Sequence, residues 1–286
     1  MSISGSALLA GVIGWPITQS LSPALHGHWI AEHGIDGAYV PLPVRPEDFA
    51  RVVDGLRRAG FRGANVTVPH KEAAFALADR HDAAARAIGA VNLLVFDESG
   101  LEGRNTDAAG LSAALIEALG PDQVKGRPVA IWGAGGTARA AVYALAEMGA
   151  GEIRLFNRTA SRAQTLASAL ASVVSARVSG AGYDRWPEEA KDVALVVHTT
   201  SAGMKKAPSL ELALDRLPDD AAVFDAVYNP LETELLAKAR TRGLRTVDGL
   251  GMLMHQAVPA FEAFYGVRPA VTPELRCALE KALSGG

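Results

Sequence analysis

The chain has almost no cysteine, since Cys277 is the only one in 286 residues. A single thiol excludes a disulfide within the chain and any zinc site built from several cysteines. Cys277 falls in an expected C-terminal helix, where a cysteine usually serves as a small apolar residue. The histidines are scattered, and the closest pair, His26 and His28, lies on different sides of an expected helix. We therefore expect no metal site.

An excess of charge of one sign is also absent. The 28 Lys and Arg residues face 31 Asp and Glu residues, which gives no electrostatic footprint for nucleic acid or an anionic membrane. No stretch reaches the ~18 uncharged apolar residues of a membrane span, and the N-terminus lacks the pattern of a signal peptide. We expect a small-molecule partner and a cytoplasmic location, and the sequence leaves monomer and homodimer open.

Strand and helix patterns alternate in the first third of the chain, as in a parallel sheet. Strands are expected at 8–13, 38–44 and 63–68, with helices at 24–33 and 46–58. Ser22 is expected to cap the first helix, with Pro23 at its first position. Strands at 91–96 and 101–105 flank a hairpin turn, and Asp107 is expected to start a helix over 108–119.

A second alternation begins at residue 128. Strands are expected near 128–132, 152–156, 193–198, 221–225 and 244–247, with helices between most of them. This pattern is typical of a doubly wound sheet. An apolar helix over 252–265 could pack on either unit. The predicted fold is α/β, with an N-terminal α/β unit followed by a Rossmann-type unit.

A glycine-rich run follows the first strand of the second unit. Gly133, Ala134, Gly135, Gly136, Thr137 and Ala138 fit the GxGxxA pattern between a buried strand and a helix. The first glycine permits a tight turn, the second lets backbone amides approach a pyrophosphate, and the small Ala138 allows close helix packing. We interpret the run as a dinucleotide site, and the alternative is a glycine turn with a structural role only.

The next strand ends without the acidic residue that would bind a free ribose 2'-hydroxyl. Asn157, Arg158 and Thr159 stand there instead, and Arg162 follows one helical turn later. Two guanidinium groups suit a 2'-phosphate, so the sequence predicts NADP as the cofactor. The alternative is a pair of solvated arginines at a helix start.

Polar residues collect where strands of the first unit end. Lys71 opens a helix, where a cation meets the positive end of the helix dipole, so its position indicates a role other than helix stabilisation. The others are Ser20, Ser22, Asn65, Thr67, Asn92, Asn105, Thr106 and Asp107. Ligands bind outside the carboxyl ends of strands in such sheets, and these groups suit a polyhydroxylated acid. Alternatively, Ser22 and Asp107 only cap helices, and Asn65 and Asn92 only satisfy buried backbone.

Nine short runs, in order along almost the whole chain, resemble the shikimate dehydrogenase family. They are SLSPALH (20–26), NVTVPHK (65–71), GAVN (89–92), NTD (105–107), GAGGTARA (133–140), NRTxxRA (157–163), TSAGM (200–204), DAVYNP (225–230) and DGLGMLMHQA (248–257). The resemblance implies NADPH-dependent reduction of 3-dehydroshikimate to shikimate in aromatic amino acid biosynthesis. It also implies a substrate domain over 1–107, an NADP-binding domain over 108–250, and C-terminal helices over 251–286 that return to the substrate domain.

The resemblance also implies roles for individual residues. Lys71 and Asp107 are the implied catalytic pair, and Lys71 supplies the proton when hydride reaches the C3 carbonyl. Ser20, Ser22 and Tyr228 are implied at the substrate carboxylate, and Asn65, Thr67, Asn92, Thr106 and Gln256 around its hydroxyls. The implied cofactor residues are Gly133, Ala134, Gly135, Gly136, Thr137, Asn157, Arg158, Thr159, Arg162, Ala226 and Gly249.

Three residues depart from the family pattern, and one of them, Arg104 before the NTD run, stands at a position that commonly varies. Leu93 stands where threonine is common, and His198 stands where asparagine is common, so His198 is expected to hold its loop by one donor and one acceptor. Two other functions remain open: a quinate or shikimate dehydrogenase that uses NAD, which the arginines disfavour, and a nonenzymatic NADP-binding sensor, which has no need of Lys71 and Asp107.

Overall fold

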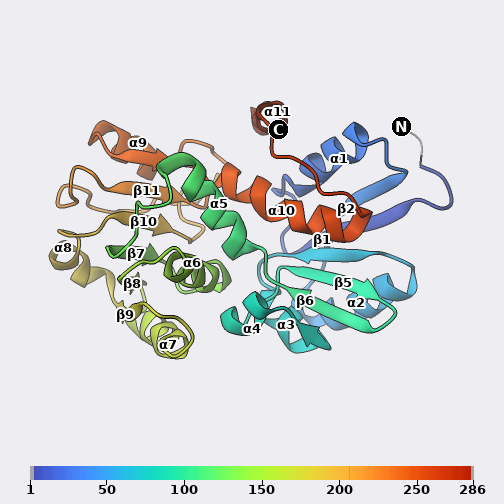
Figure 1. Cartoon of the computed structure of the whole chain (residues 1–286), viewed down its shortest axis with the longest axis horizontal. Coiled ribbons are helices and arrows are strands. Elements are labelled where there is room, and N and C mark those ends of the chain that lie inside the picture. The colour runs from blue at the N-terminus through green and yellow to red at the C-terminus, as the bar shows by residue number, and fades with distance from the viewer. Residues whose placement is uncertain (1–2, 206, 285–286) are drawn as a thin grey trace. The chain divides into compact units, whose positions relative to one another are not determined.

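The computed structural model describes residues 3–205 and 207–284 and divides into two compact units. Unit 1 holds the described residues up to Thr106 together with those from Gln256 onward, and unit 2 is Asp107–His255. The chain enters unit 2 through α5 (Asp107–Leu119) and leaves it along α10 (Gly249–Tyr265), as Figure 1 shows. No helix in the described ranges is long and apolar enough to cross a membrane.

Unit 1 is built on a six-stranded mixed sheet. Its order is β2-β1-β3-β5-β6-β4, and its strands are β1 (Leu8–Gly14), β2 (Gly37–Pro43), β3 (Gly63–Val66), β4 (Arg80–His81), β5 (Leu93–Asp97) and β6 (Gly100–Arg104). Strand β1 is parallel to β2 and β3, but β5 runs antiparallel to β3. The expected parallel arrangement of the first three strands is confirmed. Strand β6 is antiparallel to β5, and β4 is parallel to β6, so β5 is the strand of this sheet that runs against the others.

The helices of unit 1 cover this sheet. They are α1 (Ser22–Glu32), the 3-10 turn η1 (Pro46–Asp48), α2 (Phe49–Arg58), α3 (Lys71–Leu77), α4 (Ala83–Ile88), the last part of α10, and α11 (Pro273–Ser284). The Trp29 indole donates to the Ala270 carbonyl at 3.1 Å, and its ring meets Phe261 edge-on at 5.3 Å. These contacts assign the end of α10 to unit 1, a choice that the sequence had left open.

The expected cap of α1 is wrong. Leu21 is already helical, with φ −84° and ψ −6°, so the helix begins at Ser22 and no side chain caps it. Pro23 consequently occupies the second helical position, where its missing N–H still costs no helical hydrogen bond.

Unit 2 is built on a fully parallel sheet with the order β12-β11-β10-β7-β8-β9. Its strands are β7 (Pro128–Trp132), β8 (Glu152–Phe156), β9 (Arg177–Ala181), β10 (Leu195–His198), β11 (Ala222–Asp225) and β12 (Arg245–Val247). This order is that of two mononucleotide-binding halves joined at β7 and β10, where the strand order reverses. The doubly wound prediction is confirmed.

Helices pack on the sheet of unit 2, and a cluster of aromatic rings fills part of its core. The helical segments are α5, α6 (Gly136–Glu147), α7 (Ala160–Leu170), the 3-10 turn η2 (Tyr183–Arg185), α8 (Trp186–Glu189) and α9 (Glu234–Thr241). Figure 1 shows α7 lying against β8 and β9. The rings of Trp132 and Phe156 each meet Trp186 edge-on, at 5.5 and 5.3 Å.

Candidate active site

The polar edge of unit 1 is organised around Asn65, the third residue of β3. Its Oδ1 accepts a hydrogen bond from the Tyr39 hydroxyl at 2.7 Å, and its Nδ2 donates to the Asn92 carbonyl at 3.2 Å. The side chain therefore satisfies buried backbone, as one reading of the sequence expected. One N–H of the amide remains beyond the bond to Asn92, so Asn65 also retains a donor for a ligand.

Tyr39 is a site residue that the sequence analysis missed. It lies in β2, is buried, and directs its hydroxyl to Asn65. Burial raises the pKa of the Tyr39 phenol well above its usual value, while a hydrogen bond with the Ser22 side chain acts in the opposite direction. The phenol is thus a neutral donor that fixes Asn65. No local signal marks it, because its partner lies 26 residues further along the chain.

Asn92, Thr106 and Gln256 form a second polar group on the same unit. The Asn92 Oδ1 accepts from the Thr106 backbone N–H at 2.8 Å, and its Nδ2 lies 2.9 Å from Thr106 Oγ1 and 3.3 Å from Gln256 Oε1. Asn92 and Thr106 are buried, whereas Gln256 is half-buried. The structure thus brings together residues that are up to 164 positions apart, of which the sequence analysis had added Gln256 by resemblance alone.

Lys71 is the first residue of α3, as the sequence predicted. Its carbonyl accepts a hydrogen bond from the Val91 N–H at 3.0 Å, which ties the start of α3 to the segment that carries Asn92. Thr67 lies just beyond β3 and accepts from the His70 N–H with its carbonyl. Ser20 accepts from the Ser22 N–H at 3.3 Å. These bonds arrange the loops after β1 and β3 on unit 1.

Asp107 follows Thr106 directly and is the first residue of α5 in unit 2. It is 5% exposed, so its carboxyl group is held in the protein rather than in bulk water. The sequence predicted that the helix begins at residue 108, directly after Asp107. In the structure the helix begins one residue earlier, so Asp107 lies in its first turn.

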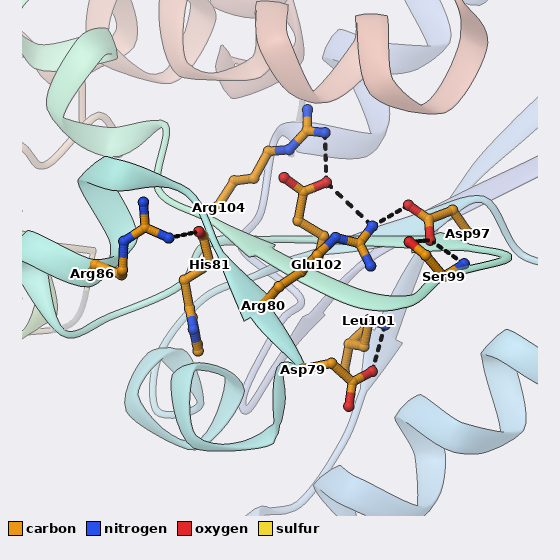
Figure 2. A network of polar contacts seen from close by, with 9 residues as sticks. All are labelled: Asp79, Arg80, His81, Arg86, Asp97, Ser99, Leu101, Glu102 and Arg104. Atoms are coloured by element: carbon orange, nitrogen blue, oxygen red, sulfur yellow. Dashed lines mark hydrogen bonds and ion pairs between the residues drawn. The ribbon is translucent and has the colours of Figure 1, made fainter.

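A chain of ion pairs braces the strand that leads to Thr106 (Figure 2). Arg80 contacts Asp97 and lies 3.7 Å from Glu102, which accepts from Arg104 at 2.7 Å. The hydrogen bond from Arg104 is the main reason that the pKa of Glu102 is lowered. The network joins β4, the end of β5, and β6. It therefore fixes the strand that directly precedes residues 105–107.

The glycine run of unit 2 has the geometry that a dinucleotide loop needs. Gly133 has φ +130°, and a Cβ there would lie 2.3 Å from Thr199 Oγ1, so only glycine fits. A Cβ on Gly135 would meet nothing within 4 Å, so a ligand can approach that backbone. Helix α6 begins at Gly136 without a side-chain cap, and Ala138 is completely buried against the sheet. Ala134 and Thr137 complete the loop, half-buried.

The arginines after β8 carry uncompensated charge. Arg158 and Arg162 are exposed, and neither forms an ion pair with a carboxylate within residues 3–205 and 207–284. Arg154 of the same strand, by contrast, is paired with Asp192 at 2.6 Å and Glu152 at 2.8 Å. The Asn157 side chain donates to the Thr159 carbonyl at 3.0 Å and shapes the turn between strand and helix. The structure therefore offers two available cations where a 2'-phosphate was predicted.

Tyr183 is a second residue that the sequence analysis missed. It is half-buried and stacks on Trp132 with ring centres 4.2 Å apart. Burial raises the pKa of the Tyr183 phenol, while a hydrogen bond with the Arg158 backbone and the nearby guanidinium lower it. Tyr183 follows β9, a strand with no clear hydrophobic alternation, so no sequence pattern near Tyr183 indicated that it lies at a strand end beside the candidate cofactor site.

The loop after β11 approaches the backbone at the ends of both neighbouring strands, β10 and β12. The Ala226 N–H donates to the His198 carbonyl at 2.9 Å, and a Cβ on Gly249 would lie 2.4 Å from the Ala226 carbonyl oxygen. Tyr228 follows two residues later and is half-buried. Clusters of His, Cys, Asp and Glu that could hold a metal are absent from the described part of the chain.

Comparison with known proteins identifies the family. The model of the shikimate dehydrogenase substrate binding domain matches residues 12–94, and that of shikimate / quinate 5-dehydrogenase matches residues 116–205. A protein of Methylobacterium radiotolerans named shikimate dehydrogenase (NADP(+)) is 54% identical over 280 residues, which cover 96% of this chain and 98% of that protein. The chain belongs to the shikimate dehydrogenase family.

Solved structures of this family and its neighbours share the fold. The shikimate 5-dehydrogenase of Thermus thermophilus, in complex with NADP(H) and shikimate, has a TM-score of 0.83 and 35% identity, covering 97% of this chain and 99% of its own. The quinate dehydrogenase of Corynebacterium glutamicum, in complex with NAD, has a TM-score of 0.86 and 33% identity with the same coverage. The predicted fold class is confirmed, but the fold alone does not separate these two cofactors.

Proposed function

We propose that the chain catalyses the NADPH-dependent, reversible reduction of 3-dehydroshikimate to shikimate, a step in the biosynthesis of chorismate and the aromatic amino acids. The observation that carries this proposal is the match, over almost the whole chain, to a protein named shikimate dehydrogenase (NADP(+)). The site residues below are proposals that the contacts on each unit support.

The polar edge of unit 1 is the proposed substrate site. Asn65, Thr67, Asn92, Thr106 and Gln256 are assigned to the substrate hydroxyls, and Ser20 and Ser22 to its carboxylate. Tyr228, a residue of unit 2, is assigned to the carboxylate by the family resemblance alone. Support comes from the internal bonds of Asn65, which fix where its second amide N–H points, and from the bonds that hold Asn92 against Thr106. Groups fixed in this way bind a polyhydroxylated ring without first losing side-chain freedom.

Lys71 and Asp107 are the proposed proton-transfer residues. In the direction of reduction, the Lys71 ammonium donates a proton to the C3 oxygen as that oxygen gains negative charge. In the reverse direction the lysine amine accepts the proton of the C3 hydroxyl. Asp107 is the proposed second member of the pair, and its carboxylate is a hydrogen-bond acceptor.

Unit 2 is the proposed NADP site; bound NADPH would supply the hydride for reduction, and bound NADP would accept it in the reverse direction. The backbone of Gly133, Ala134, Gly135, Gly136 and Thr137, with the uncapped start of α6, suits the pyrophosphate. The exposed guanidinium groups of Arg158 and Arg162, with Asn157 and Thr159, suit the 2'-phosphate. Ala226 and Gly249 are assigned to the nicotinamide half, because they lie on the second mononucleotide-binding half of the sheet.

A turnover assay tests the proposal. Purified protein with shikimate and NADP should reduce the nicotinamide, followed by its absorbance, and quinate or NAD in parallel reactions should give lower kcat/KM. A higher kcat/KM with quinate and NAD would support the alternative dehydrogenase. NADP binding without turnover of either acid would support the sensor. A cytoplasmic location and a monomer or homodimer remain predictions, and ultracentrifugation of the same sample checks the second.

A further inference from the structure

His198, the last residue of β10, is completely buried and uses both nitrogens of its ring. Its Nδ1 lies 2.8 Å from Asp225 Oδ1, and its Nε2 lies 2.6 Å from Thr200 Oγ1. The histidine and aspartate side chains are 0% and 1% exposed. The ring therefore connects the loop after β10 with the end of the neighbouring strand β11.

The directions of these hydrogen bonds follow from their partners. The Asp225 carboxylate, an acceptor, also receives the Val227 N–H at 3.0 Å and the Thr233 hydroxyl at 2.7 Å, so the ring donates from Nδ1. In the neutral ring Nε2 is then the acceptor, and the Thr200 hydroxyl donates to it. The Thr200 oxygen in turn accepts the Ala202 N–H at 3.1 Å. Each buried group is satisfied in a single arrangement.

The network controls the backbone at the carboxyl ends of β10 and β11. Through Thr200 it fixes Ala202 in one loop, and through Asp225 it fixes Val227 in the other. Thr233, which bonds to Asp225, caps α9 by accepting the Leu236 N–H at 3.3 Å. Both loops belong to the second mononucleotide-binding half, and adenosine with its 2'-phosphate belongs to the first, beyond β8.

We propose that His198 is a positioning residue for the nicotinamide half of NADP, acting through Thr200 and Asp225 on the loops after β10 and β11. The inference rests on the proposed function for the identity of the ligand. The ring does not touch the cofactor; it sets the position of backbone that does. An asparagine amide also carries a donor and an acceptor, and its Nδ2 can occupy the position of the imidazole Nδ1, so asparagine is the replacement that keeps the bond to Asp225.

The test compares His198→Leu with His198→Asn, using two ligands in titration calorimetry. One ligand is NADP. The other is adenosine 2',5'-bisphosphate, which carries the 2'-phosphate but lacks the nicotinamide half. His198→Leu should weaken NADP by about tenfold or more, since it removes both hydrogen bonds and leaves Asp225 short of a donor. Binding of the bisphosphate should change less than about twofold, and His198→Asn should restore NADP binding.

Gln123→Leu is the matched control. The Gln123 amide is also buried, but it donates to the carbonyls of Ala194 at 2.8 Å and Asp220 at 3.3 Å, which precede β10 and β11 at their opposite ends. Its loss should lower the melting temperature without changing either affinity or kcat. Thr200→Val removes only the hydroxyl, so it repeats the test with little change of shape if His198→Leu does not fold.

Equal losses of NADP and the bisphosphate in His198→Leu or Thr200→Val would overturn the proposal, because they would indicate a general loss of structure. An asparagine variant as impaired as the leucine variant would also overturn it. These binding measurements do not depend on turnover. Failure of the wild-type protein to oxidise shikimate with NADP would contradict the proposed function separately.

Discussion

The two units present their proposed binding edges in different ways. On unit 1 the edge consists largely of side chains, which are held by bonds from Tyr39 to Asn65, from Asn65 to the Asn92 carbonyl, and from Asn92 to Thr106. On unit 2 it is largely backbone, packed so closely at Gly133 and Gly249 that no methyl group fits. An edge of side chains is damaged when atoms are removed, whereas an edge of backbone is damaged when atoms are added.

The difference matches the proposed ligands. A hydroxylated ring must be distinguished from similar rings, which requires individually directed donors and acceptors. A pyrophosphate is the same in every dinucleotide, and backbone N–H groups at a helix start bind it without side chains. Each unit should therefore respond to its own kind of substitution.

Lys71→Ala, a removal on unit 1, should have the largest effect. General acid or base groups contribute typically about 10² to 10⁴-fold, so kcat should fall by that factor while shikimate still binds. Asp107→Asn should act similarly. Steady-state kinetics and shikimate titration check both. A kcat within a few-fold of wild type for Lys71→Ala would show that this lysine does not transfer the proton.

Arg158→Ala tests the exception on unit 2, a site formed by side chains. Hydrogen bonds to charged groups contribute about 1.5 to 3 kcal/mol, so NADP should bind roughly 10- to 100-fold more weakly and NAD should be little changed. Arg162→Ala should act in the same direction. Specificity constants for both cofactors provide the measurement. A similar loss for NADP and NAD would assign the arginines to the fold or to adenine.

The elements that the sequence predicted are those with local signals. The glycine run, the helix start at Lys71 and the hairpin after β5 each depend on neighbouring residues, and the structure has all three. Strand β4 has only two residues, and β9 is half-exposed, so neither shows a hydrophobic pattern. The mixed order of the first sheet depends on pairing between distant strands, which no local pattern encodes.

The hydrogen bonds that hold the candidate-site residues in place were harder to predict than the residues themselves. The polar residues at strand ends and the family resemblance both indicated Asn65 and Asn92, but Tyr39 and Asp225, the distant partner of His198, come from pairings 26 and 27 residues apart. Such contacts exist only after the sheets have formed. The sequence did predict that His198 offers one donor and one acceptor, because that follows from the imidazole itself.

Gly249→Ala, an addition on unit 2, should have a moderate effect. The new Cβ would lie 2.4 Å from the Ala226 carbonyl oxygen, and relieving such overlap costs roughly 1 to 3 kcal/mol. KM for NADP should rise. Gly55→Ala in α2 is the control, because a Cβ there meets nothing within 4 Å and alanine favours a helix. Unchanged KM in Gly249→Ala would mean that the close packing at Ala226 does not shape the cofactor site.

The smallest effect concerns a buried histidine of unit 1 that contrasts with His198. His26 is completely buried and stacks on Tyr39 with ring centres 3.9 Å apart, and neither of its ring nitrogens has a hydrogen-bond partner among the described residues. Burial lowers the pKa of His26 from 6.5 to about 3. The native ring therefore stays neutral in mild acid, where the ring of the unfolded chain gains a proton.

This difference makes stability fall as the pH decreases. Between the unfolded pKa of 6.5 and the folded value of about 3, the unfolded chain binds the extra proton, so the free energy of unfolding decreases with decreasing pH. Between pH 7 and 5.5 the loss is about 1 kcal/mol. His26→Phe keeps a ring among Tyr39, Trp29 and Phe261 but cannot titrate. Urea unfolding at pH 7 and 5.5 measures the decrease in the free energy of unfolding between the two pH values. This decrease should be smaller in the variant by about 1 kcal/mol. Equal losses in the two proteins would mean that the His26 ring of the folded protein binds a proton in this pH range as readily as that of the unfolded chain, and the contrast with His198 would disappear.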